Sequence, residues 1–566
     1  MAATRITISG GKRNTNWRGS LASLLALVLF LAGCGNSGSG SDAGSPAPSQ
    51  PAESAAAAGN APVPGGELTF ALATSPDHLD PHRSGLAVAV RVIRTLYDNL
   101  VAQAPDGSIQ PWLAKEWTVS PDGKSYTFKL REDVKFHDGT PFNAEAVKFS
   151  YDRILDPATK AANSSALIRP YESAEVVDEY TIKLNLSSPS NAFLGNLSQA
   201  LVSIVSPTAA RKYGDQFTKN PVGTGPFKFV KWEENAAITV ERNPDYNWAP
   251  PLVENQGPAY LDRVIFKIVP EEATRIGSVQ SGQILAGETV PPQNIVSLEQ
   301  EGKLQIFKSN TQGLPYTLFI NGKHAPWNET KARQALQAAI DVDTIVQTLY
   351  LGTYDRAWSA LTPGTLGYDA SLEGGIKPDL EKAKSLLDEL GWVPGDDGIR
   401  VKDGQKLSLH YVDSSPNREK RNDIAVFIQQ QLKAIGVAVE IEITKDVATV
   451  VFQGANYDIY GNSQVNSDPE ALRAFYHSAS VLPGAPQNLP GYANPELDRL
   501  LDQGLIETDP ATRVDLYKQA QQIISRDAVI IPIYVFPYTV AAAKTVKNLR
   551  FDALAYPLFN DVVIQS

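Results

Sequence analysis

Residues 407–443 read LSLHYVDSSPNREKRNDIAVFIQQQLKAIGVAVEIEI, and this stretch decides the fold class. Residues 407–412 predict a strand. A helix follows, because its apolar residues recur at helical spacing and Gly436 can end it. Residues 437–443 then alternate apolar side chains with Glu440 and Glu442, as a half-buried strand does. Strand, helix and strand at this spacing form a βαβ unit, which is typical of an α/β fold.

The rest of the chain shows the same mixture of strands and helices. Strands are predicted at 68–72, 126–130, 176–186 (two strands around Asp178 and Glu179) and 529–536, and helices after Asn143, from Pro378 to Gly391, from Asn494 and over 514–524. A chain of 566 residues is too long for one core. We therefore expect two α/β lobes built from mixed sheets, with a ligand site in the cleft between them.

The N-terminus predicts an export signal and an anchor. A basic, polar segment precedes an apolar run from Leu21 to Ala32, which is too short to span a bilayer. Leu31-Ala32-Gly33-Cys34 resembles the lipobox of bacterial lipoproteins, so we expect residues 1–33 to be a signal peptide and Cys34 to be lipidated. A plain signal peptide that happens to contain a cysteine is the alternative. Residues 34–66 are mostly Gly, Ser, Ala and Pro, which predicts a tether without a core.

Composition excludes several classes of protein. The chain carries a net charge of −11, and without its first 33 residues, which hold four basic and no acidic side chains, −15. A field of that sign repels phosphate backbones, so nucleic acid is not an expected partner. Cys34 is the only cysteine, so an internal disulfide and a thiolate metal cluster are both impossible.

Several motifs along the body carry a family resemblance. The longest are YTFKLR at 126–131 with VKFHDG at 134–139, PVGTGPF at 221–227, RNPDY at 242–246 and QLKAIGV at 431–437. In this order the chain resembles the peptide/nickel/opine-type extracytoplasmic solute-binding proteins, family 5 of the bacterial solute-binding proteins.

That resemblance implies a two-lobed periplasmic-binding-protein-like fold of type II (cluster C) with an extra subdomain. The expected parts are lobe I at 67–315 (extra subdomain at about 96–225), lobe II at 316–530 and a C-terminal return to lobe I at 531–566. It also implies a monomer outside the cytoplasm, on the cell surface or in the periplasm, that captures a solute, most simply an oligopeptide, for an ABC permease and its ATPase. The alternatives are a binder of an oligosaccharide, opine or metal chelate, and a ligand sensor for a membrane partner.

Neither catalysis nor a cofactor is expected. The chain has no G-x-S-x-G, H-E-x-x-H or P-loop pattern. His137-Asp138 lies in a turn-forming run, and the resemblance implies that this run has a structural rather than a catalytic role. His78, Asp80 and His82 could meet at a metal, but Pro81 prevents the helix that would place both histidines on one face, so no metal site is predicted.

The resemblance also suggests where the ligand is held. Peptide-binding members grip the peptide backbone by strand-like hydrogen bonds, and dipeptide-binding members add an Asp and an Arg for the two charged termini. Those two positions fall at Val465 and near Ser415, and a usual Trp falls at Asn462, so both charge anchors look absent. We therefore expect longer peptides or neutral-centred ligands rather than free dipeptides. The candidate ligand-binding residues are Ser415, Asn417, Asn462, Ser463, Gln464, Val465, Asn466, Tyr316 and Trp358; the polar ones could instead be ordinary loop residues, and the aromatic ones, like Tyr97 and Trp327, core or hinge packing.

Overall fold

The computed structural model describes residues 63–480 and 488–565. The signal peptide, Cys34 and the tether predicted from the sequence lie outside these residues, apart from the last four residues of the tether. Within the described part of the chain, no helix combines the length and the apolar character that crossing a bilayer would need.

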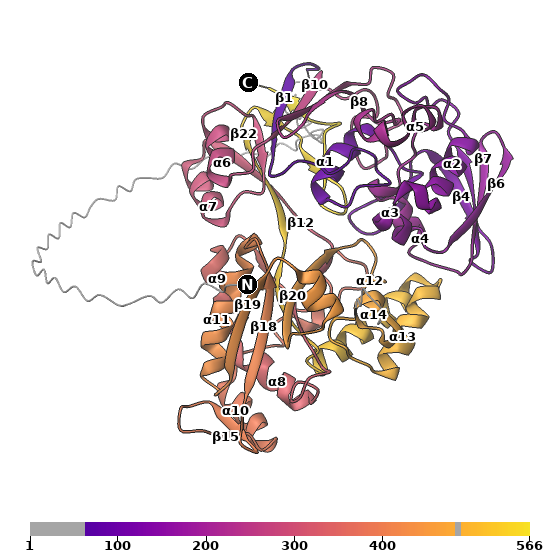
Figure 1. Ribbon diagram of the computed structural model, residues 1–566. Helices are drawn as coiled ribbons and strands as arrows, with labels where there is room; N and C mark the ends of the chain where they lie inside the picture. Colours follow the sequence, from indigo (N-terminus) through magenta and orange to yellow (C-terminus); the bar gives the residue numbers. More distant parts are fainter. Residues whose placement is uncertain (1–62, 481–487, 566) are drawn as a thin grey trace, which may run out of the picture. The chain divides into compact units, whose positions relative to one another are not determined.

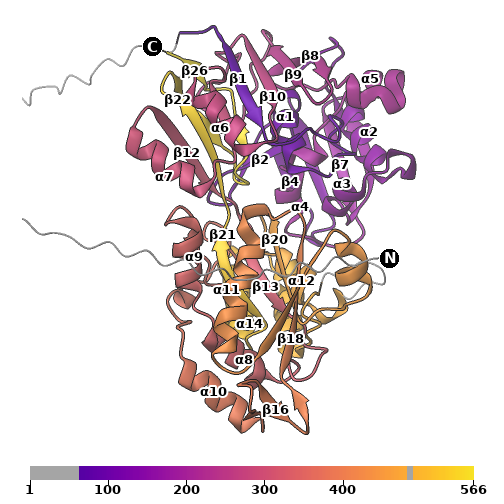
Figure 2. The same ribbon diagram turned by 60° about the vertical axis from the view of Figure 1, so that its left-hand side comes forward.

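The first lobe is built on a seven-stranded sheet (Figures 1 and 2). Its strands, in spatial order, are β12 (Leu304–Asn310), β22 (Pro537–Ala543), β11 (Ala286–Glu288), β1 (Glu67–Leu72), β10 (Arg263–Ile268), β9 (Ala237–Arg242) and β8 (Phe227–Glu233). β1 runs parallel to β10 and β11, and the other neighbours are antiparallel. Phe70, Phe266 and Phe559 pack edge to face in its core, which joins the start of this lobe to the end of the chain.

A four-stranded antiparallel sheet forms a separate layer of the first lobe. Its order is β4 (Ala114–Val119), β5 (Ser125–Leu130), β7 (Thr181–Leu186) and β6 (Tyr171–Asp178). Helix α2 (Ala144–Leu155) packs on β6 and β7 through Val147, Tyr151 and Ile154. Asn143 caps this helix as predicted, since its side chain accepts a hydrogen bond from the Ala146 N–H at 3.1 Å.

The second lobe holds a six-stranded mixed sheet, and the predicted βαβ unit is confirmed within it. The order is β14 (Asp355–Arg356), β21 (Ile530–Val535), β13 (Gly313–Ile320), β20 (Ile459–Val465), β18 (Ser408–Ser414) and β19 (Ala438–Thr444). β18 and β19 are parallel, and helix α11 (Arg421–Lys433) connects them. The apolar face of α11, which includes Ile424, Ile428 and Leu432, lies in the core under the sheet.

The remaining elements complete the two lobes. The other helices are α1 (Ala87–Leu96), α3 (Ala162–Leu167), α4 (Phe193–Leu197), α5 (Pro207–Tyr213), α6 (Glu272–Gln280), α7 (Pro292–Glu301), α8 (Thr330–Ala339), α9 (Val342–Tyr350), α10 (Leu380–Glu389), α12 (Ala471–Tyr476), α13 (Pro495–Ile506) and α14 (Pro510–Arg526). Short strands pair as β2 (Val101–Gln103) with β3 (Ile109–Pro111), β16 (Arg400–Lys402) with β15 (Val393–Pro394) and β17 (Gln405–Lys406), β23 (Val546–Lys547) with β26 (Val563–Ile564), and β24 (Arg550–Phe551) with β25 (Pro557–Leu558). Helix α10 begins two residues after the predicted Pro378, because the Asp379 side chain caps it through the Lys382 N–H.

Two strand crossings join the large sheets. β12 continues into β13 through Thr311 and Gln312, and β21 continues into β22 through Phe536. The outgoing and returning strands pair with each other in both lobes, β12 with β22 and β13 with β21. Between them, the N–H and Oγ1 of Thr311 both donate to the carbonyl of Phe536 at 3.0 Å. Such a double crossing restricts relative motion of the lobes to bending about these few residues, so we call Thr311, Gln312 and Phe536 the hinge.

Candidate functional site

The predicted residues Asn462, Ser463 and Gln464 lie near the end of β20, where the second sheet meets the hinge. β18, β20 and β21 end at this edge with Ser414, Val465 and Val535, and β13 begins there with Gly313. The carboxyl ends of strands in mixed α/β sheets are the usual place for ligand sites, because the connecting loops converge there.

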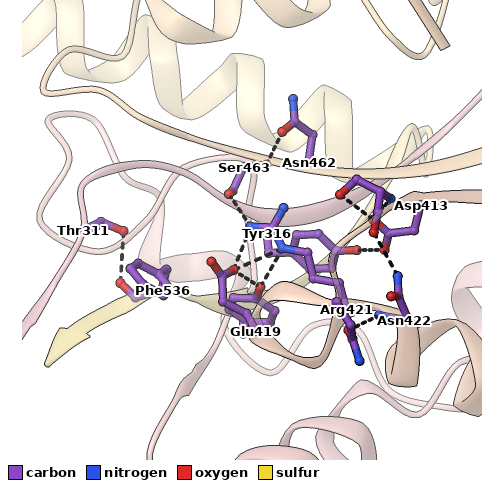
Figure 3. A network of polar contacts seen from close by, with 12 residues as sticks. Thr311, Tyr316, Asp413, Glu419, Arg421, Asn422, Asn462, Ser463 and Phe536 are labelled. Carbon is purple, nitrogen blue, oxygen red and sulfur yellow. Dashed lines mark hydrogen bonds and ion pairs between the residues drawn. The ribbon is translucent and has the colours of Figure 1, made fainter. Parts of the chain in front are cut away.

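Arg421, at the first position of α11, is the central cation of this edge (Figure 3). Its guanidinium lies over the ring of Tyr316, with the central carbon 4.4 Å from the ring centroid. Glu419 accepts from Nη2 at 2.7 Å and from the Tyr534 hydroxyl at 2.5 Å, and Nη2 also donates to Ser463 Oγ at 3.1 Å. Burial alone would lower the pKa of Arg421, but Tyr534 and Glu419 hold that pKa well above its ordinary value, so the side chain stays charged.

The loop that carries Glu419 is held in a strained conformation. Glu419 and Lys420 both adopt the left-handed backbone region, with φ of 52° and 56°. Two successive residues of this kind are costly for side chains other than glycine, and such strain concentrates at functional sites. Here it turns the Glu419 carboxylate back onto Arg421, two residues further along the chain.

Tyr316 supports this arrangement from inside the sheet. It is fully buried, stacks on Tyr534 with ring centroids 4.9 Å apart, and donates its hydroxyl to Asp413 Oδ2 at 2.9 Å. Burial raises the pKa of Asp413, while hydrogen bonds from the Ser414 N–H and from Tyr316 oppose that rise. Of the two alternatives left by the sequence, Tyr316 is therefore core packing, and the buried guanidinium of Arg421 lies over its ring.

The end of β20 carries four of the five consecutive candidates from Asn462 to Asn466. On one side it pairs with β13 as far as Val465, but its register with β18 on the other side is limited to Ile459 and Tyr460. Among the described residues, no strand pairs with 461–465 on the β18 side. The Ser463 N–H donates instead to the side-chain Oδ1 of Asn462 at 2.9 Å. Gln464 is exposed and Val465 is 39% exposed, so this strand edge is open to an incoming ligand.

Other predicted residues do not join this edge directly. Trp358 stacks under Arg356, 4.4 Å from the guanidinium carbon, and lines a cavity of about 820 Å³ that also contains Tyr354 and Tyr368. Ser415 follows β18 and donates its N–H to Thr444 O, while Asn417 is exposed and bonded to Asp423. Asn466 closes a turn by accepting from the Asp468 N–H at 2.9 Å.

Arg421 is the residue that sequence reasoning missed. The helical spacing of α11 could have indicated that Arg421 is buried, because it lies three residues before Ile424 and seven before Ile428, on the apolar stripe of the helix. A cation on a buried stripe needs partners, and the charged loop before the helix could have been searched for them.

The histidines considered for metal binding have other roles. His82 is fully buried, bonded to Ser203 O and to Arg153, and its pKa is lowered to about 4 by burial. Asp80 pairs with the same arginine at 2.5 Å. His78 contacts Thr218 Oγ1 at 3.1 Å. Asp80 and His82 thus join a polar network between the β1–α1 segment and α2, and His78 lies apart from it.

Two α/β lobes, a double-stranded hinge and an open polar strand edge beside it define a two-lobed binding protein. The family model of bacterial extracellular solute-binding proteins, family 5 (middle region), matches residues 108–482. The chain therefore belongs to this family, as its motifs suggested, and it is the solute-binding component of an ABC transport system.

Individual relatives agree with this assignment. The glutathione-binding protein GsiB of Escherichia coli is 29% identical over 503 residues, covering 85% of this chain and 91% of that protein. The solved structure of DppA from Helicobacter pylori with the peptide STSA is 28% identical, with a TM-score of 0.74 and coverage of 89% of this chain and 99% of that one. NikA from Brucella suis with Fe(III)-EDTA is 27% identical, with a TM-score of 0.77 and coverage of 88% and 100%. These relatives are solute-binding transport proteins and do not favour the alternative of a ligand sensor.

Proposed function

We propose that the solute of this protein is an oligopeptide that binds in extended form along residues 461–465. The observation that carries this proposal is the strand edge that β20 leaves without a described partner strand beyond Tyr460. A peptide can add to such an edge by main-chain hydrogen bonds, which are independent of its side chains. Relatives named for glutathione binding and solved with the peptide STSA support a peptide ligand.

The contacts at this edge fit a peptide backbone. The Ser463 N–H donates to the side-chain Oδ1 of Asn462 at 2.9 Å. A peptide carbonyl that accepted from this N–H would therefore replace one amide oxygen with another. Each such exchange changes the free energy by about 1 kcal/mol or less, and the affinity then grows with the number of residues that pair. Oligopeptides should therefore bind more tightly than dipeptides.

In this proposal the peptide is captured by bending at the hinge. Thr311 and Phe536 are tied by two hydrogen bonds, so the crossings move together while the lobes close on the peptide. The expected lobe limits at 315/316 and 530/531 fall inside β13 and β21 of the second-lobe sheet, so we propose that the lobes divide at the hinge instead. A monomeric state is likewise a proposal. No catalytic step is part of this function.

The location of the protein is partly given by its family, whose members work outside the cytoplasm. We propose that a lipid on Cys34 holds the protein on the membrane, with residues 34–66 as the tether. The support is the tetrapeptide ending at Cys34 behind a short apolar run.

Calorimetric titration of residues 63–566 with polyalanine peptides of two to six residues tests the peptide assignment. We expect the dissociation constant to fall at least tenfold from the dipeptide to the tetrapeptide. Equal affinity at all lengths, or no binding of any peptide, would contradict it.

A further inference from the structure

A second cavity, of about 820 Å³, lies at the outer edge of the second sheet. Strand β14 and helix α9 line it, together with side chains from Trp358 to Glu373. In the sheet, β21 and β13 separate β14 from β20, so three strand spacings, about 14 Å, lie between these two strands. The cavity is therefore a different place in the second lobe from the strand edge at 461–465, and its volume is in the range of sites for small molecules.

Arg356 is a buried cation on the wall of this cavity. Its side chain is 10% exposed, and its guanidinium carbon lies 4.4 Å from the ring centroid of Trp358. Nη1 donates to the carbonyls of Ala357 and Pro532, but none of the described residues accepts a hydrogen bond from Nε or Nη2. Burial lowers the pKa of Arg356 to about 10, and the nearby Asp343 only partly opposes that effect. The guanidinium is therefore short of the anionic partner that a buried cation requires.

Three carboxylates line the same cavity and differ in what they already bind. Asp355 accepts a hydrogen bond from Asn310 Nδ2 at 2.6 Å. Asp343 Oδ1 lies 3.4 Å from Nε of the arginine, which is beyond the usual length of an N–H···O hydrogen bond. Glu373 Oε1 accepts from the Tyr368 hydroxyl at 2.9 Å, and no described residue donates to its Oε2. Asp343 and Glu373 thus keep oxygens that can accept hydrogen bonds from a cation.

This arrangement of charges favours a ligand that carries both signs. Three carboxylates repel a simple anion, and a simple cation would leave Arg356 without an acceptor. Arg356 and Asp343 lie side by side, as do the carboxylate and the ammonium on the α-carbon of an amino acid, and charge-assisted hydrogen bonds of this kind are the strong ones. Glu373 is then left for a second positive group, with the rings of Trp358 and Tyr368 as apolar walls for the methylene groups between.

We propose that this cavity binds a free α-amino acid with a cationic side chain, such as L-arginine or L-lysine. Arg356 binds the carboxylate, Asp343 the α-ammonium and Glu373 the cation of the side chain. The site goes beyond the proposed peptide function and does not depend on it.

Calorimetric titration of the protein with L-arginine, agmatine and L-citrulline tests this proposal. Agmatine lacks only the carboxylate of arginine, and citrulline has a neutral group in place of the guanidinium. We expect L-arginine to bind at least tenfold more tightly than either, because each analogue lacks one charged group. A saturating concentration of tetraalanine should leave the affinity for L-arginine within threefold, since the two sites are separate.

Variants of the lining residues assign the binding to this cavity. Asp343→Asn and Glu373→Gln should each weaken L-arginine binding at least fivefold, and since both side chains are exposed, the fold should tolerate the changes. Arg356→Gln should reduce the preference for L-arginine over agmatine to less than threefold. Because that variant also loses the hydrogen bonds to two carbonyls, its melting temperature is measured alongside. Glu381→Gln is the control, since it removes an exposed carboxylate of the same lobe outside the cavity, and it should bind L-arginine as the wild type does.

Four outcomes would overturn the inference. They are no binding of L-arginine, equal affinity for L-arginine and agmatine, an affinity that survives both Asp343→Asn and Glu373→Gln, and displacement of L-arginine by tetraalanine, which would place it at the peptide edge. Binding of L-arginine with the expected preferences but no binding of tetraalanine would contradict the proposed peptide function and support this second site.

Discussion

The hydroxyl of Tyr316 reaches Oδ2 of Asp413 at 2.9 Å by passing over Gly461, which lies on the strand between them. A β-carbon built at Gly461 would overlap the Tyr316 hydroxyl and ring. The sheet therefore needs glycine at this position so that the tyrosine can support Arg421 from below.

Gly461→Ala tests this requirement. Since Tyr316 is fully buried between Tyr534 and the sheet, it cannot move aside, and we expect the free energy of unfolding to fall by about 1–3 kcal/mol. Gly277→Ala in α6 is the control, because nothing outside the adjoining residues and the helix's own backbone lies within 4 Å of the added carbon; it should be neutral or stabilising by up to about 1 kcal/mol. Urea unfolding measures both. Equal stability of wild type and Gly461→Ala would refute the account of Tyr316.

Stability should also depend on pH through Glu470. Burial, with a contribution from Asp468, raises the pKa of this carboxyl from 4.5 to about 7, against the opposing effect of Arg513. Because the folded state holds the proton more tightly than the unfolded one, the stabilisation is complete below pH 4.5 and is lost as the pH rises to 7. The loss is on the order of 3 kcal/mol. Glu470→Gln should flatten the pH dependence of the melting temperature between about pH 5 and 7, whereas parallel curves would refute the assignment.

The sequence predicts the local elements of this molecule better than the contacts between distant ones. The βαβ unit over 407–443 is confirmed because its signal is local, in the two periodicities of strand and helix. The cluster of Arg421, Tyr316 and Tyr534 could not be predicted. Its members come from three elements up to 218 residues apart, and only the register of the second sheet brings them together. The left-handed backbone at Glu419 has no sequence signal either, since no glycine marks it.

Val465→Asp should create the missing anchor for a ligand amino group. Val465 is 39% exposed, so a carboxylate there costs little, and one charge-assisted bond contributes about 1.5–3 kcal/mol. We expect peptides with a free N-terminus to bind ten- to a hundredfold more tightly, with N-acetylated peptides unchanged. Val465→Asn controls for size and polarity. Tight wild-type binding of a free dipeptide, unaffected by Val465→Asp, would contradict the ligand class.

Membrane attachment should depend on Cys34. With a lipid on its thiol the protein should sediment with membranes, and Cys34→Ala should move it to the soluble fraction while peptide affinity stays the same. Persistence of the variant in the membrane fraction would show that another segment anchors it.

The most direct test of the peptide site is amide hydrogen exchange over residues 461–465, with and without a saturating tetrapeptide. The Ser463 N–H is held by its neighbour's side chain, and the strand edge on the β18 side has no described partner strand. If a peptide adds to this edge, exchange at Ser463 and Val465 should slow at least tenfold, while residues of the distant α10 keep their rates. Saturated binding that leaves the exchange of 461–465 unchanged would contradict the account.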